Sequence, residues 1–281
     1  MPFRKPRTQA PPRSAVTDWR SFDGVAEEYD RLRAAVHAPP VRDLLEMLGP
    51  LEGARILDVG TGTGIAASEA MALVGPEGSV TGVDASAGML GRARHRGLSR
   101  LAVAEAIDLP FPDSSFDVVV STFVIFFFRK YQTALYDMLR VLRTGGRLGV
   151  TTWGSAEDEF RRTWREVAES FVGREMLRDA GRQMAPWEEM FSDPARLRQT
   201  LHEAGLREVR VEEREYRVTM RVADYLATRE LAGTGRFMRS MLGAATWERF
   251  REQVASEFAS RFPDPIGDTE DVLLAIGTKP A

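Results

Sequence analysis

Short apolar runs and stretches with helical spacing alternate along the first half of the chain. The apolar runs, which predict buried strands, lie at 55–59, 79–83, 101–104, 116–123 and 147–152. The stretches that predict helices between them lie at 65–74, 89–96 and 131–142. Because strands that alternate with helices pair in parallel and are covered on both faces, this pattern predicts an α/β protein with a doubly wound sheet.

The second half of the chain has a different pattern. Charged stretches with helical spacing occupy 155–205 and 222–262, and two further segments, 206–218 and 271–278, predict strands. Together with the first five, these strands predict a Rossmann-like, mostly parallel sheet of seven strands. The helical stretches then form lid insertions after strands five and six.

A helical pattern also precedes the first strand, over residues 21–48. We expect the pair Pro39 and Pro40 to break this helix, because proline lacks the N–H group that helical hydrogen bonding needs.

These patterns divide the chain into three parts. Residues 1–20 hold five basic residues against one acid, with several prolines, and are expected to form a disordered basic tail. Residues 21–153 are expected to form the ligand-binding core with an N-terminal helical flap. Residues 154–281 are expected to supply the lid helices and the last two strands of the same sheet.

The composition limits the chemistry that the chain can perform. It has 281 residues, a formal net charge of -3 and no cysteine, so thiolate nucleophiles, disulfides and thiolate metal sites are excluded. Since proteins that bind nucleic acid are usually basic, we expect no nucleic-acid partner. No apolar run approaches the roughly 20 residues of a membrane helix, and no secretory signal is recognisable. We expect a cytoplasmic protein, either a monomer or a homodimer.

The segment ILDVGTGTGIAA, residues 56–67, joins the first strand to the following helix. In a doubly wound sheet, ligands bind beyond the carboxyl ends of the strands. Glycine permits a left-handed backbone and lets a ligand lie against the chain. The following helix directs free N–H groups toward the loop. We therefore expect Gly60, Gly62 and Gly64 to line a ligand site.

Two cofactors fit such a loop. Gly62, Gly64 and Ala67 match the G-x-G-x-x-G/A spacing of a dinucleotide site, which is short enough to occur by chance. The same segment has the form acid-x-G-x-G-x-G of an S-adenosylmethionine loop, with Asp58 as the acid. A carboxylate there attracts the ammonium and sulfonium groups of that cofactor and repels a pyrophosphate. Asp84, at the end of the second strand, can accept ribose hydroxyls of either cofactor.

Two later segments resemble a known family. They are AEAIDLPFPDSSFDVVVSTFVIFFF from Ala104 and MLRVLRTGGRLGVTTW from Met138. Both closely resemble the later motifs of class I S-adenosylmethionine-dependent methyltransferases, and the nearest branch is the ubiquinone/menaquinone-biosynthesis group of small-molecule methyltransferases. The resemblance covers roughly residues 20–153, with a weaker similarity at LHEAGLREVRVEE. It implies that the core binds S-adenosylmethionine.

The resemblance also implies which residues contact the cofactor. Those near the methionyl group and the loop are Tyr29, Asp58, Gly60, Thr61, Gly62, Gly64, Ser121 and Phe123. Asp84 is implied to hold the ribose. The residues implied to touch the adenine are Ala85, Glu105 and Ala106, and glutamate at position 105 stands where the family usually has aspartate.

The implied reaction is methyl transfer to an apolar or aromatic small molecule, by O-, C- or N-methylation. The sulfonium leaves as a neutral thioether, so the protein mainly aligns the reactants and excludes water. Neither a metal site nor a catalytic triad is therefore expected. His37 is a candidate general base for an acceptor that arrives protonated, with simple packing as its alternative.

Two other functions stay open on sequence alone. A nicotinamide-dependent oxidoreductase could use the same glycines, although no Tyr-x-x-x-Lys motif follows the fourth strand. A protein with the methyltransferase fold could also bind the cofactor without methylating anything.

Overall fold

The computed structural model describes residues 22–281, so the predicted tail and Ser21 lie outside the described part. The strands are β1 Arg55–Val59, β2 Ser79–Asp84, β3 Leu101–Val103, β4 Phe116–Thr122, β5 Leu142–Trp153, β6 Arg207–Met220 and β7 Ile266–Thr278. The helices of the first half are α1 Ala26–Met47, α2 Ile65–Val74, α3 Ala87–His95, the short 3-10 helix η2 Ile125–Phe127 and α4 Tyr131–Val141. The later helices are α5 Glu159–Val172, α6 Arg174–Met184, α7 Glu188–Phe191, α8 Pro194–Glu203, α9 Val222–Leu231, α10 Gly233–Met241 and α11 Ala244–Arg261.

The seven strands form one sheet in the order β3-β2-β1-β4-β5-β7-β6. The first five strands are parallel, whereas β7 runs antiparallel to both β5 and β6. The predicted Rossmann-like, mostly parallel sheet is therefore confirmed. The order reverses between β1 and β4, and their carboxyl ends mark the point where such sheets bind ligands.

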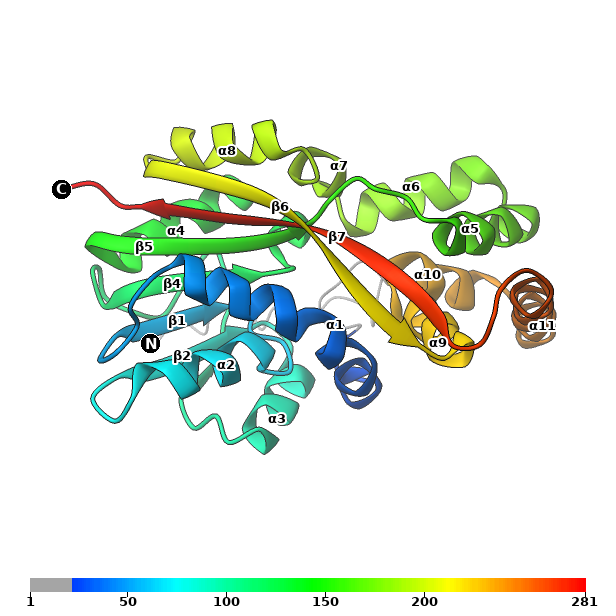
Figure 1. Cartoon of the computed structure of the whole chain (residues 1–281), viewed down its shortest axis with the longest axis horizontal. Coiled ribbons are helices and arrows are strands. Elements are labelled where there is room, and N and C mark those ends of the chain that lie inside the picture. The colour runs from blue at the N-terminus through cyan, green and yellow to red at the C-terminus, as the bar shows by residue number, and fades with distance from the viewer. Residues whose placement is uncertain (1–21) are drawn as a thin grey trace, which may run out of the picture.

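Each face of the sheet carries its own apolar core, because neighbouring residues of a strand point to opposite sides. On one face, Leu57 and Val119 pack with residues of α4, α7 and α8. On the other, Ile56 and Val118 pack with residues of α1 and α2. Figure 1 shows these helices on the two sides of the sheet.

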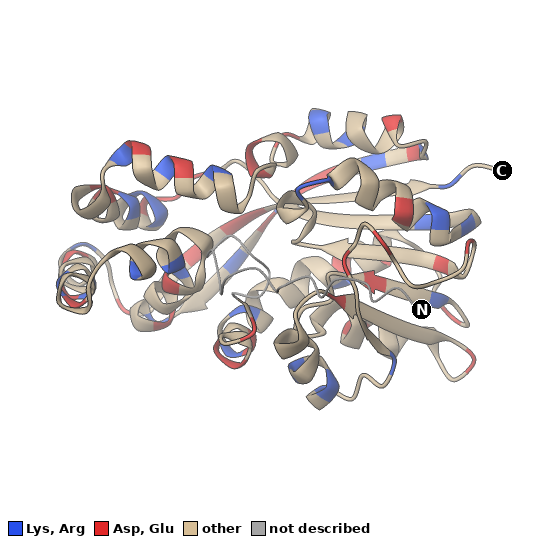
Figure 2. Ribbon diagram, turned by 180° about the vertical axis from the view of Figure 1, so that it is seen from behind, with Lys and Arg blue, Asp and Glu red and all other residues tan. Residues whose placement is uncertain are grey.

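The helices that follow β5 and β6 build a third core, separate from the sheet. Trp164, Tyr225, Met238 and Phe250 are among its buried members. Figure 1 shows β6 and β7 extending beyond the other strands toward α9. In Figure 2 this extension carries acidic and basic residues. We use the name lid for α5, α6, α9, α10 and α11.

Three details differ from the sequence-based expectations. Pro39 and Pro40 lie inside α1, so the predicted break at this pair is wrong. Packing of Val41, Leu44 and Leu45 against the sheet outweighs the lost N–H donors. The fifth and last strands begin at Leu142 and Ile266, before the predicted 147 and 271. The early start of β5 follows from pairing of Leu142 with Phe116 of β4 and from hydrogen bonds of Gly145 and Gly146 with Lys279.

Among residues 22–281, no helix has both the length and the apolar character that crossing a membrane requires.

Candidate cofactor and acceptor site

The glycine loop between β1 and α2 turns sharply, and its three glycines have different surroundings. Their φ angles are +75° at Gly60, +54° at Gly62 and +85° at Gly64. A Cβ at Gly60 would lie 2.7 Å from Val124, and one at Gly64 would lie 2.5 Å from Leu98. A Cβ at Gly62 would meet nothing within 4 Å. Gly60 and Gly64 therefore permit close packing, whereas Gly62 borders open space in which a ligand can approach the backbone.

Asp58 lies fully buried beneath this loop. Its Oδ2 accepts hydrogen bonds from Thr61 Oγ1 at 2.7 Å and from the N–H of Ala67 at 3.1 Å. Its Oδ1 has no hydrogen-bond partner in the described part of the chain. Burial raises the pKa of Asp58 to about 7, and the charge of Asp84 contributes. An unpartnered buried oxygen is costly, so this carboxylate favours a cationic or hydrogen-bonding ligand.

Asp84 ends β2 and faces the same loop. Its Oδ2 accepts the N–H of Gly62 at 2.8 Å and its Oδ1 accepts the N–H of Ser86 at 2.8 Å. Burial raises the pKa of Asp84. Each carboxylate oxygen has two acceptor positions, so both oxygens can still accept a ribose hydroxyl.

These features test whether the residues suit S-adenosylmethionine. The open space at Gly62, the unpartnered Asp58 oxygen and the remaining acceptor positions of Asp84 all fit that cofactor. A dinucleotide would instead bring its phosphates close to two carboxylates, which is electrostatically unfavourable.

Four rings beside the loop, those of Phe123, Trp153, His37 and Tyr29, form an aromatic wall, and Phe22 contacts its edge. Phe123, at the end of β4, stacks on Trp153 at 4.2 Å and on His37 at 4.5 Å between ring centroids. Tyr29 meets His37 edge-on at 5.9 Å and Phe22 at 6.1 Å. Phe123 has a left-handed backbone, with φ +56°, which turns the chain out of the sheet at this point. The wall gives the space beyond the loop an apolar, aromatic side.

His37 is buried within this wall, and its Nε2 has no hydrogen-bond partner among the described residues. Burial, with the nearby charge of Arg33, lowers the pKa of His37 well below 6.5. The imidazole is therefore neutral near pH 7, and its Nε2 can make one hydrogen bond to a ligand.

The other predicted contacts lie at or directly after the ends of β2, β3 and β4. Ser121 is buried and donates to the carbonyl of Val59 at 3.1 Å. Ala85 follows Asp84 directly and is half-buried. Glu105 is exposed and Ala106 half-buried, in the turn after β3. The structure places all of them at the carboxyl ends of the strands.

Sequence reasoning did not single out two contributors to this site. Trp153 completes the aromatic wall, and its position at the end of a strand was the available signal. Asp23 accepts from Ser86 Oγ at 2.6 Å and from the N–H of Gly88 at 3.0 Å, which ties the segment before α1 to the start of α3. No local pattern marks Asp23, because its partners are 63 and 65 residues away.

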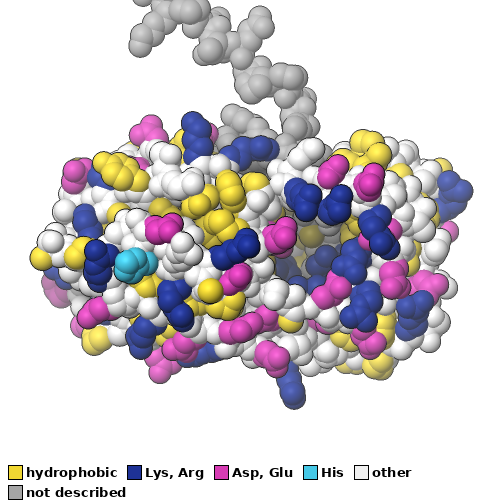
Figure 3. Space-filling model, turned by 90° about the horizontal axis from the view of Figure 1, so that it is seen from above, with side chains coloured by type: hydrophobic (Ala, Val, Ile, Leu, Met, Phe, Trp, Pro, Cys, Tyr) yellow, Lys and Arg dark blue, Asp and Glu magenta, His cyan; other side chains and the backbone are white. Residues whose placement is uncertain are grey.

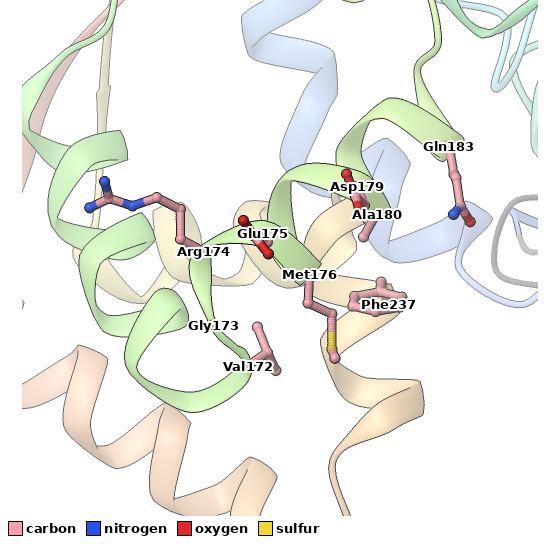
Figure 4. A pocket seen from close by; sticks show the side chains of 9 residues that line it. All are labelled: Val172, Gly173, Arg174, Glu175, Met176, Asp179, Ala180, Gln183 and Phe237. Carbon is pink, nitrogen blue, oxygen red and sulfur yellow. The ribbon is translucent and has the colours of Figure 1, made fainter.

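Two kinds of hollow lie beyond the loop. Figure 3 shows a hollow between the sheet half and the lid half, with basic and acidic side chains around it. A second, open groove of about 680 Å³ lies wholly within the lid, between α6 and Phe237 of α10 (Figure 4). None of the predicted cofactor residues lines the second groove. In the described part of the chain, no group of three His, Asp or Glu side chains has the arrangement of a metal site.

The chain is similar in sequence to proteins of known activity. The family described as "Methyltransferase domain" matches residues 57–150. The ubiquinone/menaquinone biosynthesis C-methyltransferase UbiE of Stutzerimonas stutzeri is 37% identical over 138 residues, which cover 45% of this chain and 54% of that protein. The aklanonic acid methyltransferase DauC of Streptomyces sp. is 34% identical over 139 residues, covering 47% of this chain and 63% of that protein. The chain thus spans little more than half the length of these relatives.

Solved structures share the fold over most of the chain. A phosphoethanolamine N-methyltransferase of Haemonchus contortus, solved with S-adenosylhomocysteine, superposes with a TM-score of 0.59 at 17% identity and covers 97% of this chain and 62% of its own. This likeness concerns the fold alone. The matching domain and the relatives show that residues 57–150 carry a methyltransferase domain, and with the seven-stranded sheet they support a class I S-adenosylmethionine-dependent methyltransferase.

Proposed function

We propose that this chain transfers a methyl group from S-adenosylmethionine to an apolar or aromatic small molecule bound between the strand ends and the lid. The observation that carries the proposal is the pair of carboxylates at the glycine loop. Asp58 accepts a hydrogen bond from Thr61 and Asp84 accepts one from the N–H of Gly62, so both carboxylates lie against neighbouring residues of the loop. Burial raises the pKa of Asp58, and the charge of Asp84 adds to this effect. A cationic cofactor relieves this repulsion, whereas a phosphate-bearing cofactor increases it.

In this proposal the chain's residues bind and orient. S-adenosylmethionine supplies, when bound, a methyl group on a positively charged sulfur. Asp84 holds the ribose, Gly62 lets the cofactor approach the backbone, and Asp58 offsets positive charge beneath the loop. The aromatic wall of Phe123, Trp153 and Tyr29 excludes water and aligns the acceptor with the methyl group.

His37 has a narrower role in the proposal. Its neutral imidazole can accept a proton or hold an acceptor hydroxyl at the unpartnered Nε2. A histidine with a lowered pKa is a weak base, so we assign His37 to positioning the acceptor.

The first test measures cofactor binding by calorimetry. Wild-type protein is expected to bind S-adenosylmethionine, and Asp84→Ala to bind it at least tenfold more weakly. The substitution removes a charge-assisted acceptor for hydroxyls, worth roughly 1.5–3 kcal/mol. Circular dichroism of the variant checks that the fold is intact.

An unchanged dissociation constant in the folded variant would remove Asp84 from the site. Stabilisation by nicotinamide dinucleotides, with S-adenosylmethionine inert, would instead favour an oxidoreductase. Transfer of labelled methyl groups to a mixture of metabolites then separates an active enzyme from a protein that only binds the cofactor. The cytoplasmic location and the oligomeric state stay predictions.

A further inference from the structure

Asp23 lies in the turn before α1, and its exposed side chain is held against the start of α3. Its Oδ1 accepts hydrogen bonds from Ser86 Oγ at 2.6 Å and from the N–H of Gly88 at 3.0 Å. The backbone approaches equally closely, since a Cβ at Gly88 would lie 2.5 Å from the carbonyl oxygen of Asp23. Glycine at position 88 therefore permits this approach, and the carboxylate of Asp23 is fixed against α3.

Ser86 connects Asp23 to the proposed ribose site. Its side chain is buried, donates its only hydroxyl proton to Asp23 and accepts the N–H of Met89 at 3.1 Å. Its backbone N–H donates to Asp84 Oδ1 at 2.8 Å. Asp23 and Asp84 therefore bind the same residue, one through its hydroxyl and the other through its backbone.

The orientation of the Asp84 carboxylate depends on backbone donors at both of its oxygens. Gly62 donates to Oδ2 and Ser86 donates to Oδ1. Oxygens held in this way direct their remaining acceptor positions to a fixed place. If Ser86 moved, Oδ1 would lose a fixed donor, while Oδ2 would still be held by Gly62, which borders open space. Ribose hydroxyls would then meet a less well oriented carboxylate and bind more weakly.

Contacts with the lid hold the turn from the other side. The Arg236 guanidinium of α10 lies over the Phe22 ring, 3.9 Å from its centroid. Phe22 also meets Phe127 edge-on, at 6.2 Å between ring centroids. Because Phe22 and Asp23 are consecutive, the lid contacts one residue of this segment and α3 contacts the next.

Capping of α3 is the simplest alternative role for Asp23. A carboxylate near a helix N-terminus satisfies free N–H groups and interacts favourably with the helix dipole. This role accounts for the hydrogen bond from Gly88 and predicts an effect on stability alone. The hydrogen bond from Ser86 has a further consequence, because it fixes the residue whose backbone holds Asp84. The two roles therefore differ in whether Asp23 affects cofactor binding through Asp84.

We propose that Asp23 is a positioning residue for the cofactor, which fixes Ser86 and through it orients Asp84 toward the ribose hydroxyls. The proposal rests on the proposed function, in which Asp84 holds the ribose. It extends the cofactor site to the turn before α1, which the lid contacts through Phe22. Asp23 acts on the cofactor only through Asp84, so its contribution to binding disappears when Asp84 is removed.

The test is a double-mutant cycle, with S-adenosylhomocysteine as the probe and calorimetry as the measurement. Asp23→Ala is expected to bind it about three- to tenfold more weakly than the wild type, because Ser86 loses a hydrogen bond. Asp84→Ala is expected to bind it at least about tenfold more weakly. The double variant should bind within about twofold of Asp84→Ala, because the effect of Asp23 passes through Asp84.

Further variants separate positioning from a general effect of charge. Asp23→Asn keeps an oxygen that can accept both hydrogen bonds, so it should bind within about twofold of the wild type. Glu27→Ala, which removes an exposed acid of the same segment, is the matched control and should bind as the wild type does. If circular dichroism shows that Asp23→Ala does not fold, Ser86→Ala replaces it in the cycle. That substitution removes the hydroxyl and leaves the backbone N–H to Asp84.

The outcomes distinguish this proposal from the proposed function. Failure of the wild type to bind the probe, or unchanged binding by Asp84→Ala, would contradict the proposed function and this proposal with it. If Asp84→Ala binds weakly but folded Asp23→Ala binds normally, Asp23 only caps α3. If the double variant shows the product of the two single losses, Asp23 acts independently of Asp84. Either of these last two results would overturn the positioning role alone.

Discussion

At the scale of single residues, the glycine loop shows why a motif alone does not define a site. Gly60, Gly62 and Gly64 look equivalent in the sequence. The structure distinguishes them, because a Cβ at the first or third would collide with neighbouring side chains, whereas Gly62 borders open space. This difference depends on Val124 and Leu98, which lie close to Gly60 and Gly64 in space but far from them in the sequence. The motif alone therefore does not show it.

Gly62→Val is expected to abolish cofactor binding while the protein still folds. The branched side chain would project into the space next to the loop and disfavour the left-handed backbone, at a cost of about 1–2 kcal/mol. Gly97→Val is the control, since Gly97 also has a positive φ and open surroundings but lies after α3. Binding by Gly62→Val equal to that of Gly97→Val would show that the ligand does not lie on the loop.

Asp58 should make cofactor binding depend on pH. Its pKa of about 7 means that the free protein holds a proton there at lower pH, whereas the cofactor's positive charge favours the carboxylate. Affinity is therefore expected to fall below pH 7, by up to about tenfold per pH unit. Calorimetry at pH 6 and 8, in buffers of different ionisation enthalpy, should show proton release on binding. Asp58→Asn should release fewer protons, and equal affinity of the wild type at both pH values would count against this role.

At the scale of elements, α1 links the site to the rest of the sheet. Asp30 near its start pairs with Arg92 of α3 at 3.2 Å and with Arg96, which directly follows α3, at 2.5 Å. The sequence predicted a helical pattern from residue 21, but the helix begins at Ala26, after a turn. Phe22, in the turn before α1, still meets the Tyr29 ring edge-on.

Closure of this segment over the cofactor stays a prediction that hydrogen exchange can test. Amides 29–33 should exchange more slowly once S-adenosylmethionine is bound, because the helix start would then be held against the ligand. Amides 198–203 of α8, on the opposite face of the sheet, should be unaffected. If exchange at 29–33 is the same with saturating cofactor, the segment does not act as a flap and Tyr29 has only a packing role.

At the scale of the whole molecule, the parallel half of the sheet was predictable and the lid contacts were not. Buried parallel strands are continuous apolar runs bounded by glycine, so the ranges 55–59 and 65–74 agree with β1 and α2. Helical spacing shows that a lid segment is helical, but it does not show which side chains meet. Asp158 and Asp268, 110 positions apart, come together only through the path of β7. The long helix through Pro39 and Pro40 was missed because tertiary packing overrides local preference.

The proximity of the Asp268 carboxyl to that of Asp158 should affect the free energy of unfolding. Burial, with the charges of Glu270 and Asp158, raises the pKa of Asp268 to about 7. Because the pKa of Asp268 is higher in the folded than in the unfolded protein, its contribution to the stability of the fold is complete below pH 3.8. This contribution is lost as the pH rises through 7. Asp268→Asn does not ionise, so its advantage over the wild type should grow between pH 5.5 and 8.5, on the order of 1–2 kcal/mol. Urea unfolding at both pH values measures this, and a constant difference would contradict it.

The position of β7 between β5 and β6 has a consequence for synthesis on the ribosome. Strands β1 to β5 can pair as they emerge, so the glycine loop and its two carboxylates belong to a half that can form early. The outermost strand β6 has β7 as its sheet neighbour, and it must wait unpaired until residues 266–278 have been made. An unpaired strand of 14 residues invites association with other chains. The nascent protein therefore passes through a stage in which the parallel strands β1 to β5 are paired while β6 still needs protection from aggregation.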